Sequence, residues 1–342
     1  MKPLPRDRLS HEGPQVARLC LGAMMFGDQA DATEAFRILD TYRAAGGDFI
    51  DTADVYAQGG SETILGTWLE RHRAEVVIAT KVGNPMRDQP GSGGISRQWI
   101  LAALEGSLNR LRTEFIDLYY LHADDNATPL EETIGTLGEL IASGRIRGWG
   151  FSNFRAWKIA EMIRLADGLG VARPIAAQPY YHLLNRVAEA EYLPACRHFG
   201  IGAVTYSPLA RGVLTGKYRG ETVPEGSRAA RGDARLLETE FRPETIAAAN
   251  AFAEQAEASG REPIALAIRW VLANSAVASV LIGPKSVAQM TSYLRAFEID
   301  YGADDEAALD RFCAPGHTPA PAYSDPRYPY RGRIARLDAG PD

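Results

Sequence analysis

The stretch IDLYYLHADDNATPLEETIGTLGELIASGRIRGWGF, which spans residues 116–151, contains one complete strand–helix–strand unit. Its two ends, Ile116–Leu121 and Ile146–Phe151, are short apolar runs rich in Ile, Tyr and Phe, as is typical of strands buried on both faces. Between them, Pro129–Ser143 places apolar residues at the spacing of a helix. A helix that joins two such strands predicts a parallel sheet.

Both ends of the helix in this unit carry sequence signals. Thr128 is predicted to be its N-cap, Pro129 to occupy its first position, and Glu131 to complete a capping box. Gly144 follows the last turn and is predicted to end the helix. These signals support a helix of about four turns between the two strands.

The same alternation extends from about residue 18 to residue 298. Strands are predicted at Arg18–Leu21, Phe49–Asp51, Val76–Thr80, Ile116–Leu121, Ile146–Phe151, Ile175–Gln178, Ala203–Tyr206 and Ser279–Ile282. Helices are predicted at Thr33–Ala45, Ser61–Glu70, Ser96–Leu111, Pro129–Ser143, Arg155–Leu169, Glu189–Phe199, Glu244–Ala258, Pro263–Ala273 and Ser286–Phe297. Eight such units predict a single α/β domain, a closed (β/α)8 TIM barrel with long loops at its C-terminal face.

A doubly wound nucleotide-binding sheet is the competing fold. It normally carries the pattern GxGxxG directly after its first strand. Residues 22–27 read GAMMFG at that place, which does not match. The barrel is therefore the favoured prediction.

Three segments lie outside the alternation. Residues 1–17 are predicted to form an N-terminal hairpin, and residues 1–314 as a whole to form the barrel domain. Residues 215–243 form a long loop rich in Gly, Arg and Glu. Residues 315–342 contain six of the twenty prolines and three tyrosines, and we expect them to form an extended C-terminal tail.

Composition excludes several classes of protein. The 342 residues are 46% hydrophobic and 23% charged with a net charge of −6, and no long basic run marks a nucleic-acid binder. No apolar run approaches the ~20 residues of a membrane helix, and the first fifteen residues lack the apolar core of a secretory signal. Cys20, Cys196 and Cys313 are scattered, without disulfide or metal spacing. We therefore expect a cytoplasmic protein without a metal site; the sequence leaves its oligomeric state open.

Polar residues follow the predicted strands one after another. Asp51, Lys81 and His122 come at the ends of the second, third and fourth strands, and Tyr56 lies in the loop after the second. Taken singly, each is most simply a helix cap, a solvated lysine, a structural histidine or a half-buried aromatic residue. Since strand ends converge on one face of a barrel, the joint pattern instead predicts a carboxylate, an ammonium, an imidazole and a phenol in one site.

This set of groups suits the reduction of a carbonyl. A phenol has a pKa of about 10, and we expect the Lys81 ammonium to lower that pKa so that Tyr56 can donate a proton. Asp51 would hold Lys81 charged and oriented, and His122 could donate a hydrogen bond to the substrate oxygen. A carbonyl oxygen that gains negative charge on hydride addition needs such a proton donor.

Ordered motifs over roughly residues 18–298 resemble the aldo-keto reductase family. They are DTADVY at 51–56 with GSE at 60–62, Lys81, Leu121-His122, PLEET at 129–133, GFSNF at 150–154, Gln178, YSPL at 206–209 and GVLTGKY at 212–218. The resemblance implies a barrel that binds a nicotinamide cofactor, with Tyr56 as general acid aided by Lys81 and Asp51, and His122 orienting the carbonyl. The substrate would be a small carbonyl compound, with no role for nucleic acid or membrane.

The same resemblance assigns a cofactor site. Ser152, Asn153 and Gln178 would hold the carboxamide, Tyr206 would stack on the nicotinamide, and Ser207, Leu209, Arg211 and Gly212 would lie along the pyrophosphate. Gly22 and Met24 belong to this site, and Gly283, Lys285, Ser286, Gln289 and Tyr293 would take the adenosine end. Lys285 and Ser286 open the last predicted helix and could hold a 2′-phosphate, so NADPH is favoured over NADH.

Two positions depart from the family pattern. Ala57 stands where the family often has Gly, and Tyr293 stands where it often has Asn. Tyr293 could stack on adenine or could simply pack against its neighbours.

Two other functions remain open at this stage. The family includes potassium-channel β subunits, which keep the catalytic residues but act as partners of a larger protein, and the Pro/Tyr-rich tail is a candidate partner surface. The second function that the sequence leaves open is that of a barrel aldolase, which would use Lys81 to form a Schiff base. Asp51 nearby would keep Lys81 protonated and a poor nucleophile.

Overall fold

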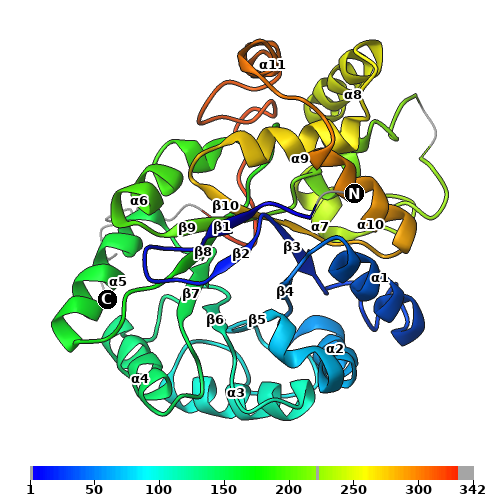
Figure 1. Cartoon of the computed structure of the whole chain (residues 1–342). Coiled ribbons are helices and arrows are strands. Elements are labelled where there is room, and N and C mark those ends of the chain that lie inside the picture. Colours follow the sequence, from blue (N-terminus) through cyan, green and yellow to red (C-terminus); the bar gives the residue numbers. More distant parts are fainter. Residues whose placement is uncertain (1–2, 221–222, 330–342) are drawn as a thin grey trace, which may run out of the picture.

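Eight parallel strands close into a barrel in the computed structural model, which describes residues 3–220 and 223–329 (Figure 1). The barrel strands are β3 (Leu19–Gly22), β4 (Phe49–Asp51), β5 (Val77–Val82), β6 (Leu118–Leu121), β7 (Trp149–Ser152), β8 (Ala176–Gln178), β9 (Gly202–Tyr206) and β10 (Val277–Ile282). Each pairs in parallel with the next, and β10 pairs with β3 to close the ring. The predicted (β/α)8 barrel is confirmed, and every predicted strand is present.

Helices surround the barrel between its strands (Figure 1). They are α1 (Ala32–Ala44), α2 (Gly60–His72), α3 (Arg97–Leu111), α4 (Leu130–Ala142), α5 (Ala156–Leu169), α6 (Tyr192–Phe199), α7 (Ala234–Glu238), α8 (Pro243–Ala258), α9 (Pro263–Ala273), α10 (Val287–Leu294) and α11 (Ala303–Asp310). Short 3₁₀ helices occur at Tyr56–Gly59, Arg73–Glu75, Val187–Glu189, Ala210–Thr215 and Arg295–Phe297.

The helices α7 and α11 were not predicted from the sequence. The first is a single short helix inside the long loop 215–243, capped by the Asp233 side chain, which accepts the Leu236 N–H at 2.9 Å. The second has three acidic residues in its first turn, and Leu309 is its one buried residue. Neither helix therefore shows the apolar periodicity by which helices are recognised.

The start of α4 differs from the prediction. Pro129, not Thr128, occupies the N-cap position, and the Thr128 hydroxyl donates to Asp125 Oδ2 at 2.6 Å. Asp125 Oδ1 also accepts the N–H groups of Ala127 and Thr128, so it closes the preceding turn. The predicted capping box with Glu131 is wrong for this reason, whereas Gly144, with φ of 73°, ends the helix as predicted.

The barrel interior is filled by buried aliphatic and aromatic side chains and one cysteine. These are Leu9, Val16, Cys20, Phe49, Ala79, Leu118, Tyr120, Ala176, Val204 and Ala278. Tyr120 leaves room only for glycine on the next strand, because a Cβ on Gly150 would lie 2.7 Å from its ring and 2.4 Å from the Ala176 carbonyl oxygen. A filled interior leaves the strand ends as the place for a site.

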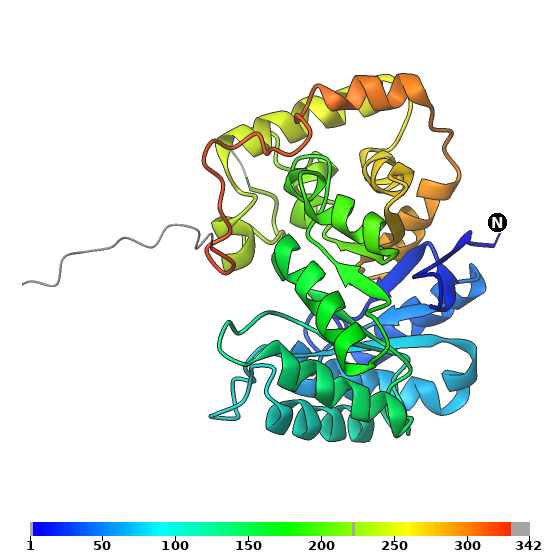
Figure 2. The same ribbon diagram turned by 90° about the vertical axis from the view of Figure 1, so that its left-hand side faces the viewer.

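Residues near the N-terminus close one end of the barrel. β1 (Arg6–Arg8) and β2 (Gln15–Ala17) form an antiparallel hairpin, and Leu9 and Val16 from this segment belong to the interior cluster. Asp48 accepts the Ala17 N–H at 2.8 Å, which ties the hairpin to the barrel. Figure 2 shows the hairpin at one end of the barrel and the C-terminal segment, in red, at the other.

The described part of the tail, residues 315–329, contains no helix or strand. It is not a simple extension, because turns and polar contacts hold it against the barrel domain. Near the start of the tail, the backbone N–H of Arg186 donates to the His317 carbonyl at 2.9 Å. Further along, the Arg235 guanidinium donates to both carboxylate oxygens of Asp325 at 2.6 and 3.0 Å. The remainder of the predicted tail, residues 330–342, lies outside the described residues.

Among the described residues, no helix is both long and apolar enough to cross a membrane. Cys20, Cys196 and Cys313 are buried and free.

Candidate active site

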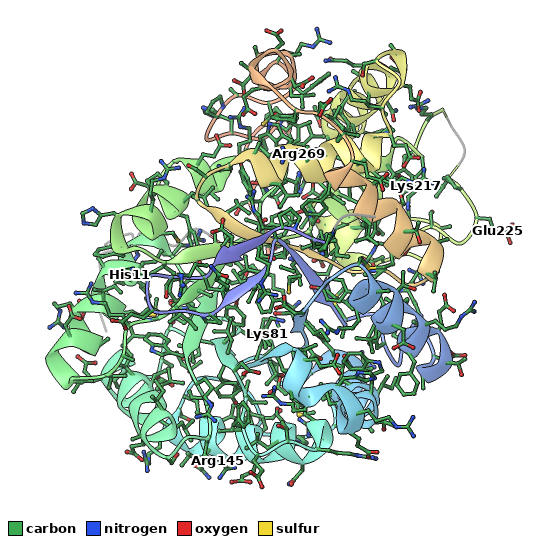
Figure 3. All side chains as sticks on the ribbon, viewed as in Figure 1. His11, Lys81, Arg145, Lys217, Glu225 and Arg269 are labelled. Atoms are coloured by element: carbon green, nitrogen blue, oxygen red, sulfur yellow. The ribbon has the colours of Figure 1, made fainter. Side chains whose placement is uncertain are left out.

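A cavity of about 1110 Å³ opens at the C-terminal ends of the barrel strands. Of the predicted site residues, the ones that line it are Asp51, Tyr56, His122, Gly22, Met24, Ser152, Asn153, Gln178, Tyr206, Ser207, Leu209, Arg211, Gly212, Gly283, Lys285, Gln289 and Tyr293. Lys81 lies behind the wall, fully buried at the centre of the ring of strands, and Ser286 caps α10 by accepting the Gln289 N–H (Figure 3). The fold thus brings nearly all of the predicted residues together.

Lys81 is held between three oxygen atoms. Its Nζ forms an ion pair with Asp51 Oδ1, donates to the Thr52 carbonyl at 2.7 Å, and lies 3.3 Å from the Tyr56 hydroxyl. Burial lowers the pKa of Lys81, but the negative charge of Asp51 and the contact with Tyr56 outweigh it, so the net direction is upward. Lys81 is therefore a buried ammonium that faces the Tyr56 hydroxyl.

The Tyr56 pKa is raised, not lowered as the sequence analysis predicted. Burial of the phenol raises the pKa most, while the Lys81 charge lowers it, as expected, by a smaller amount. The prediction considered the neighbouring charge and missed the cost of taking a phenolate out of water. The phenol therefore holds its proton through neutral pH and can act as an acid.

His122 stands beside Tyr56 at the end of β6. The two ring centroids are 5.9 Å apart with the rings nearly perpendicular, and His122 Nδ1 is buried without a hydrogen-bond partner among the described residues. Burial, followed by the charges of Lys81 and Arg327, lowers the pKa of His122 well below its usual value. The imidazole is therefore neutral at pH 7, and one of its nitrogens can carry a proton for a substrate oxygen.

A hydrogen-bonded chain fixes the opposite wall of the cavity. Gln178 Nε2 donates to Asp51 Oδ2 at 2.9 Å, and the Ser152 hydroxyl donates to the Gln178 carbonyl at 2.8 Å. Asn153 Nδ2 donates to the Ser152 hydroxyl at 2.9 Å, and the Tyr206 hydroxyl donates to Asn153 Oδ1 at 2.8 Å. This wall is therefore preorganised and is connected to the Lys81–Asp51 pair.

Four cations gather at another part of the cavity. Lys217, Arg228, Arg231 and Lys285 all line it, and Arg228 pairs with Asp233 at 2.8 Å. Partial burial, followed by the charges of Arg228, Lys285 and Arg231, lowers the pKa of Lys217. Such crowding of positive charge is typical of a site for a phosphate group.

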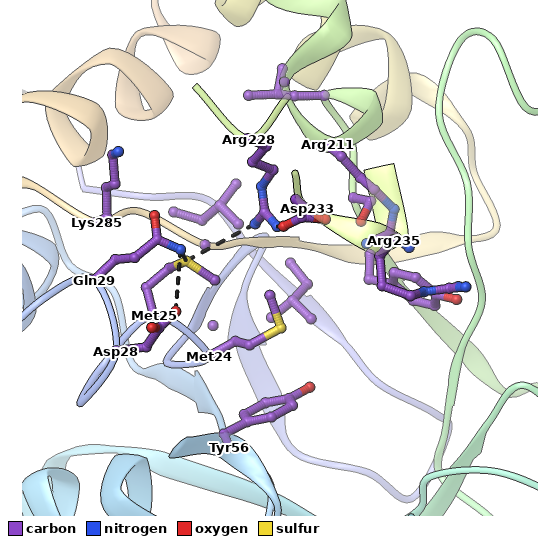
Figure 4. Close-up of a pocket in the computed structure, with 18 of the residues that line it drawn as sticks. Met24, Met25, Asp28, Gln29, Tyr56, Arg211, Arg228, Asp233, Arg235 and Lys285 are labelled. Carbon is purple, nitrogen blue, oxygen red and sulfur yellow. Dashed lines mark hydrogen bonds and ion pairs between the residues drawn. The ribbon is translucent and has the colours of Figure 1, made fainter. Parts of the chain in front are cut away.

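Two loops meet over the cavity beside these cations. Arg228 Nη2 lies 4.0 Å from Met25 Sδ, and Gln29 Nε2 lies 3.2 Å from the same sulfur (Figure 4). Met25 and Gln29 follow β3, whereas Arg228 belongs to the long loop 215–243. The two loops therefore form one edge of the cavity.

The sequence analysis did not identify several lining residues. They are Gln29, Arg87, Arg228, Arg231, Arg327 and Tyr328. The arginine content of the loop 215–243 was a usable signal for two of them. Arg327 and Tyr328 lie in the predicted tail, and the tertiary structure places both of them in the cavity lining.

The departures from the family pattern have a local explanation. Ala57 has φ of 49°, in the left-handed region that favours glycine, which accounts for a glycine there in other members. Tyr293 on α10 is buried, lines the cavity and has a pKa raised to about 12, chiefly by burial. Its ring is therefore available at the cavity wall.

Asp54 is a buried carboxyl behind this site. Its side chain is fully buried and neither oxygen has a hydrogen-bond partner among the described residues. Burial and then the neighbouring Glu62 raise the pKa of Asp54 to about 7. An unfolded chain releases this proton near pH 3.9, so the native state binds it more tightly and loses stability as pH rises from about 4 to 7.

We predict that Asp54→Asn removes this loss. Between pH 5 and pH 8 the wild type should lose about 2–3 kcal/mol in free energy of unfolding that the variant does not lose, because the amide does not ionise. Urea unfolding of both proteins at the two pH values measures the difference. If the free energies of unfolding of the two proteins differed by the same amount at pH 5 and pH 8, Asp54 would not titrate in this range.

Comparisons with known proteins agree with this geometry. A family model described as the Aldo/keto reductase family matches residues 18–313. The chain is 35% identical over 329 residues to the Bacillus subtilis (strain 168) "Uncharacterized oxidoreductase YrpG", covering 92% of this chain and 98% of that protein. It is 36% identical over 299 residues to an Oryza sativa subsp. japonica "Probable voltage-gated potassium channel subunit beta", covering 85% and 90% respectively. An Arabidopsis thaliana protein with the same description is 35% identical over 307 residues.

Proposed function

Because the chain belongs to the aldo/keto reductase family, we propose that it is an NADPH-dependent oxidoreductase that reduces aldehydes or ketones to alcohols. The observation that carries this proposal is the position of the Tyr56 hydroxyl. It lies 3.3 Å from the buried Lys81 ammonium, at the wall of the cavity and beside His122. A neutral phenol backed by a fixed positive charge is suited to protonate an oxygen that becomes negative.

The cavity suits a dinucleotide phosphate cofactor. Its volume of about 1110 Å³ exceeds that of most small-molecule pockets, which leaves room for a substrate as well. The cluster of Lys217, Arg228, Arg231 and Lys285 supplies positive charge for phosphates. Gly22 also lines the cavity, at the end of β3.

Each residue of the site has a separate task in this proposal. When bound, NADPH supplies the hydride, so that a carbonyl, NADPH and a proton give an alcohol and NADP⁺. Tyr56 transfers its proton to the carbonyl oxygen, and Lys81 stabilises the phenolate that remains. His122 donates a hydrogen bond that orients the same oxygen, and Asp51 keeps Lys81 charged. Ser152, Asn153 and Gln178 would hold the carboxamide, and Tyr206 would contact the nicotinamide ring.

The test is reduction of a panel of carbonyl compounds with NADPH. We expect one alcohol formed for each NADPH consumed with at least one member among methylglyoxal, 4-nitrobenzaldehyde, short aldehydes and aldoses. Absorbance at 340 nm measures consumption, and mass spectrometry identifies the alcohol. NADPH binding without turnover of any compound would contradict the proposal.

A regulatory role is the second candidate, because two of the relatives are described as probable potassium channel β subunits. In that case the cofactor should bind very tightly and exchange slowly, with little turnover. Displacement of bound NADPH by excess NADP⁺, followed by fluorescence, separates the two functions: rapid exchange with turnover supports the enzyme.

The aldolase alternative receives no support from the site. Lys81 is fully buried, is paired with Asp51 and lies behind the cavity wall. A Schiff-base lysine needs a neutral, accessible amine, which this environment opposes.

A further inference from the structure

The substrate end of the cavity carries positive charge that the proposed reaction does not use. Arg327 and Arg87 both line the cavity, and neither side chain forms an ion pair with an acidic group in the described part of the chain. Three acidic side chains among the described residues line the cavity, and none of them pairs with either arginine: Asp51 pairs with Lys81, Asp233 pairs with Arg228, and Asp28 accepts a hydrogen bond from Gln29 Nε2 at 3.3 Å. The mouth therefore has unbalanced positive charge.

Arg327 lines the same cavity as Tyr56 and His122, and the tail segment that carries it is held by Arg155, which follows β7. The Arg327 charge helps to lower the pKa of His122, after burial and the Lys81 charge. The pKa of Lys217, in contrast, is lowered by burial and by the charges of Arg228, Lys285 and Arg231. Tyr328, the next residue, also lines the cavity, and it is among the influences that raise the pKa of Tyr56, after burial. Both tail residues thus line the cavity together with the predicted catalytic pair, Tyr56 and His122.

The chain holds this segment in place with two arginines from the barrel. Arg235 on α7 contacts both oxygens of Asp325 at 2.6 and 3.0 Å, and Asp325 Oδ1 accepts the Arg327 N–H at 2.9 Å. Arg155, at the start of α5, donates to the carbonyls of Tyr328 and Pro329 at 2.8 and 2.7 Å. A side chain on a segment fixed at both ends is positioned in advance for a ligand.

We infer that residues 325–328 form an anion-binding subsite of the substrate pocket, and that the substrate is a carbonyl compound with a carboxylate or another anionic group at its far end. This inference rests on the proposed reductase function. The planar guanidinium of Arg327 matches the two oxygens of such a group, and Tyr328 provides an apolar face for the part of the substrate between the anion and the carbonyl.

Matched pairs of aldehydes test the inference. We compare 4-carboxybenzaldehyde with its neutral methyl ester, and 4-formylphenyl phosphate with 4-methoxybenzaldehyde, in the full chain with NADPH. The wild type should prefer the anionic member of at least one pair by about tenfold or more in kcat/KM, which is the effect of one charge-assisted contact. The pair that shows the preference identifies the anion as carboxylate or phosphate.

Substitution of Arg327 assigns the preference to this residue. In Arg327→Gln the ratio within the preferred pair should fall to near one, while Arg327→Lys should retain part of it. Arg164→Gln is the matched control, because Arg164 is exposed on α5 and, within residues 3–220 and 223–329, forms an ion pair with Glu161 alone. Calorimetric titration of the alcohol products, charged and neutral, should show the same change in affinity.

The outcomes separate the two proposals. Equal turnover of charged and neutral aldehydes by the wild type would overturn the anion subsite and leave the reductase intact. A preference that survives in Arg327→Gln would also overturn it. Turnover of none of the four aldehydes or of the wider panel would contradict the reductase function itself.

Discussion

Tyr56→Phe should lose at least about a thousandfold in kcat for carbonyl reduction while it binds NADPH within about twofold of the wild type. The substitution removes one hydroxyl, whose one hydrogen-bond contact among the described residues is with Lys81 at 3.3 Å. Without that hydroxyl, the oxygen that becomes negative has no proton donor at the cavity wall. General acid catalysis typically contributes about 10²–10⁴ in rate, and this loss corresponds to about 4 kcal/mol of barrier.

Steady-state kinetics and fluorescence titration of NADPH measure the two quantities separately. Tyr192→Phe is the matched control, because its hydroxyl is buried without a partner among the described residues and lies outside the cavity lining. It should keep kcat within about twofold of the wild type, since it removes no group from the site. Wild-type turnover in Tyr56→Phe would remove this residue from the role of acid.

The pH dependence of reduction follows from the same environment. Burial raises the pKa of Tyr56 above its ordinary value, so the acid form is present throughout the neutral range. The rate should therefore stay level through neutral pH and fall only in alkaline solution, as the phenol loses its proton. A profile of kcat/KM against pH that instead falls between pH 6 and pH 8 would assign the titrating acid to another group.

The barrel and the convergence of the predicted catalytic residues were predictable because their signals are local. Each strand is a short apolar run, and Asp51, Lys81 and His122 follow their strands directly, so chain order alone places them at one face. The helix α11 gave no such signal, since its acidic first turn and single buried leucine lack an apolar period. Local pattern thus identified the scaffold and the residues attached to strand ends.

Contacts between distant segments were not predictable in this way. Arg228 approaches Met25 across 203 residues, and Arg235 holds Asp325 across 90 residues. No local pattern specifies such pairs, because they depend on how the loops and the tail cross the finished barrel. The upward shift of the Tyr56 pKa was missed for a related reason: it depends on burial, which the full tertiary structure determines.

Lys285→Met should weaken NADPH binding by about 10- to 100-fold and change NADH binding by no more than about twofold. Lys285 lines the cavity within the cation cluster, and among the described residues its side chain has no acidic partner, so its charge is free for a ligand. The two cofactors differ by one phosphate. A residue that contacts that phosphate must therefore discriminate between them, whereas a residue that only supports the fold would affect both equally.

Calorimetric titration of each cofactor into the wild type, Lys285→Met and the control Lys158→Met measures the ratio of the two dissociation constants. Lys158 on α5 pairs with Asp124 and is absent from the cavity lining, so its loss should leave the ratio unchanged. Arg228 and Arg231 remain in Lys285→Met, so the cluster keeps part of its charge and the preference for NADPH should be reduced and not reversed. A parallel loss of affinity for both cofactors would place Lys285 outside the phosphate site and would leave the NADPH preference to Lys217, Arg228 and Arg231.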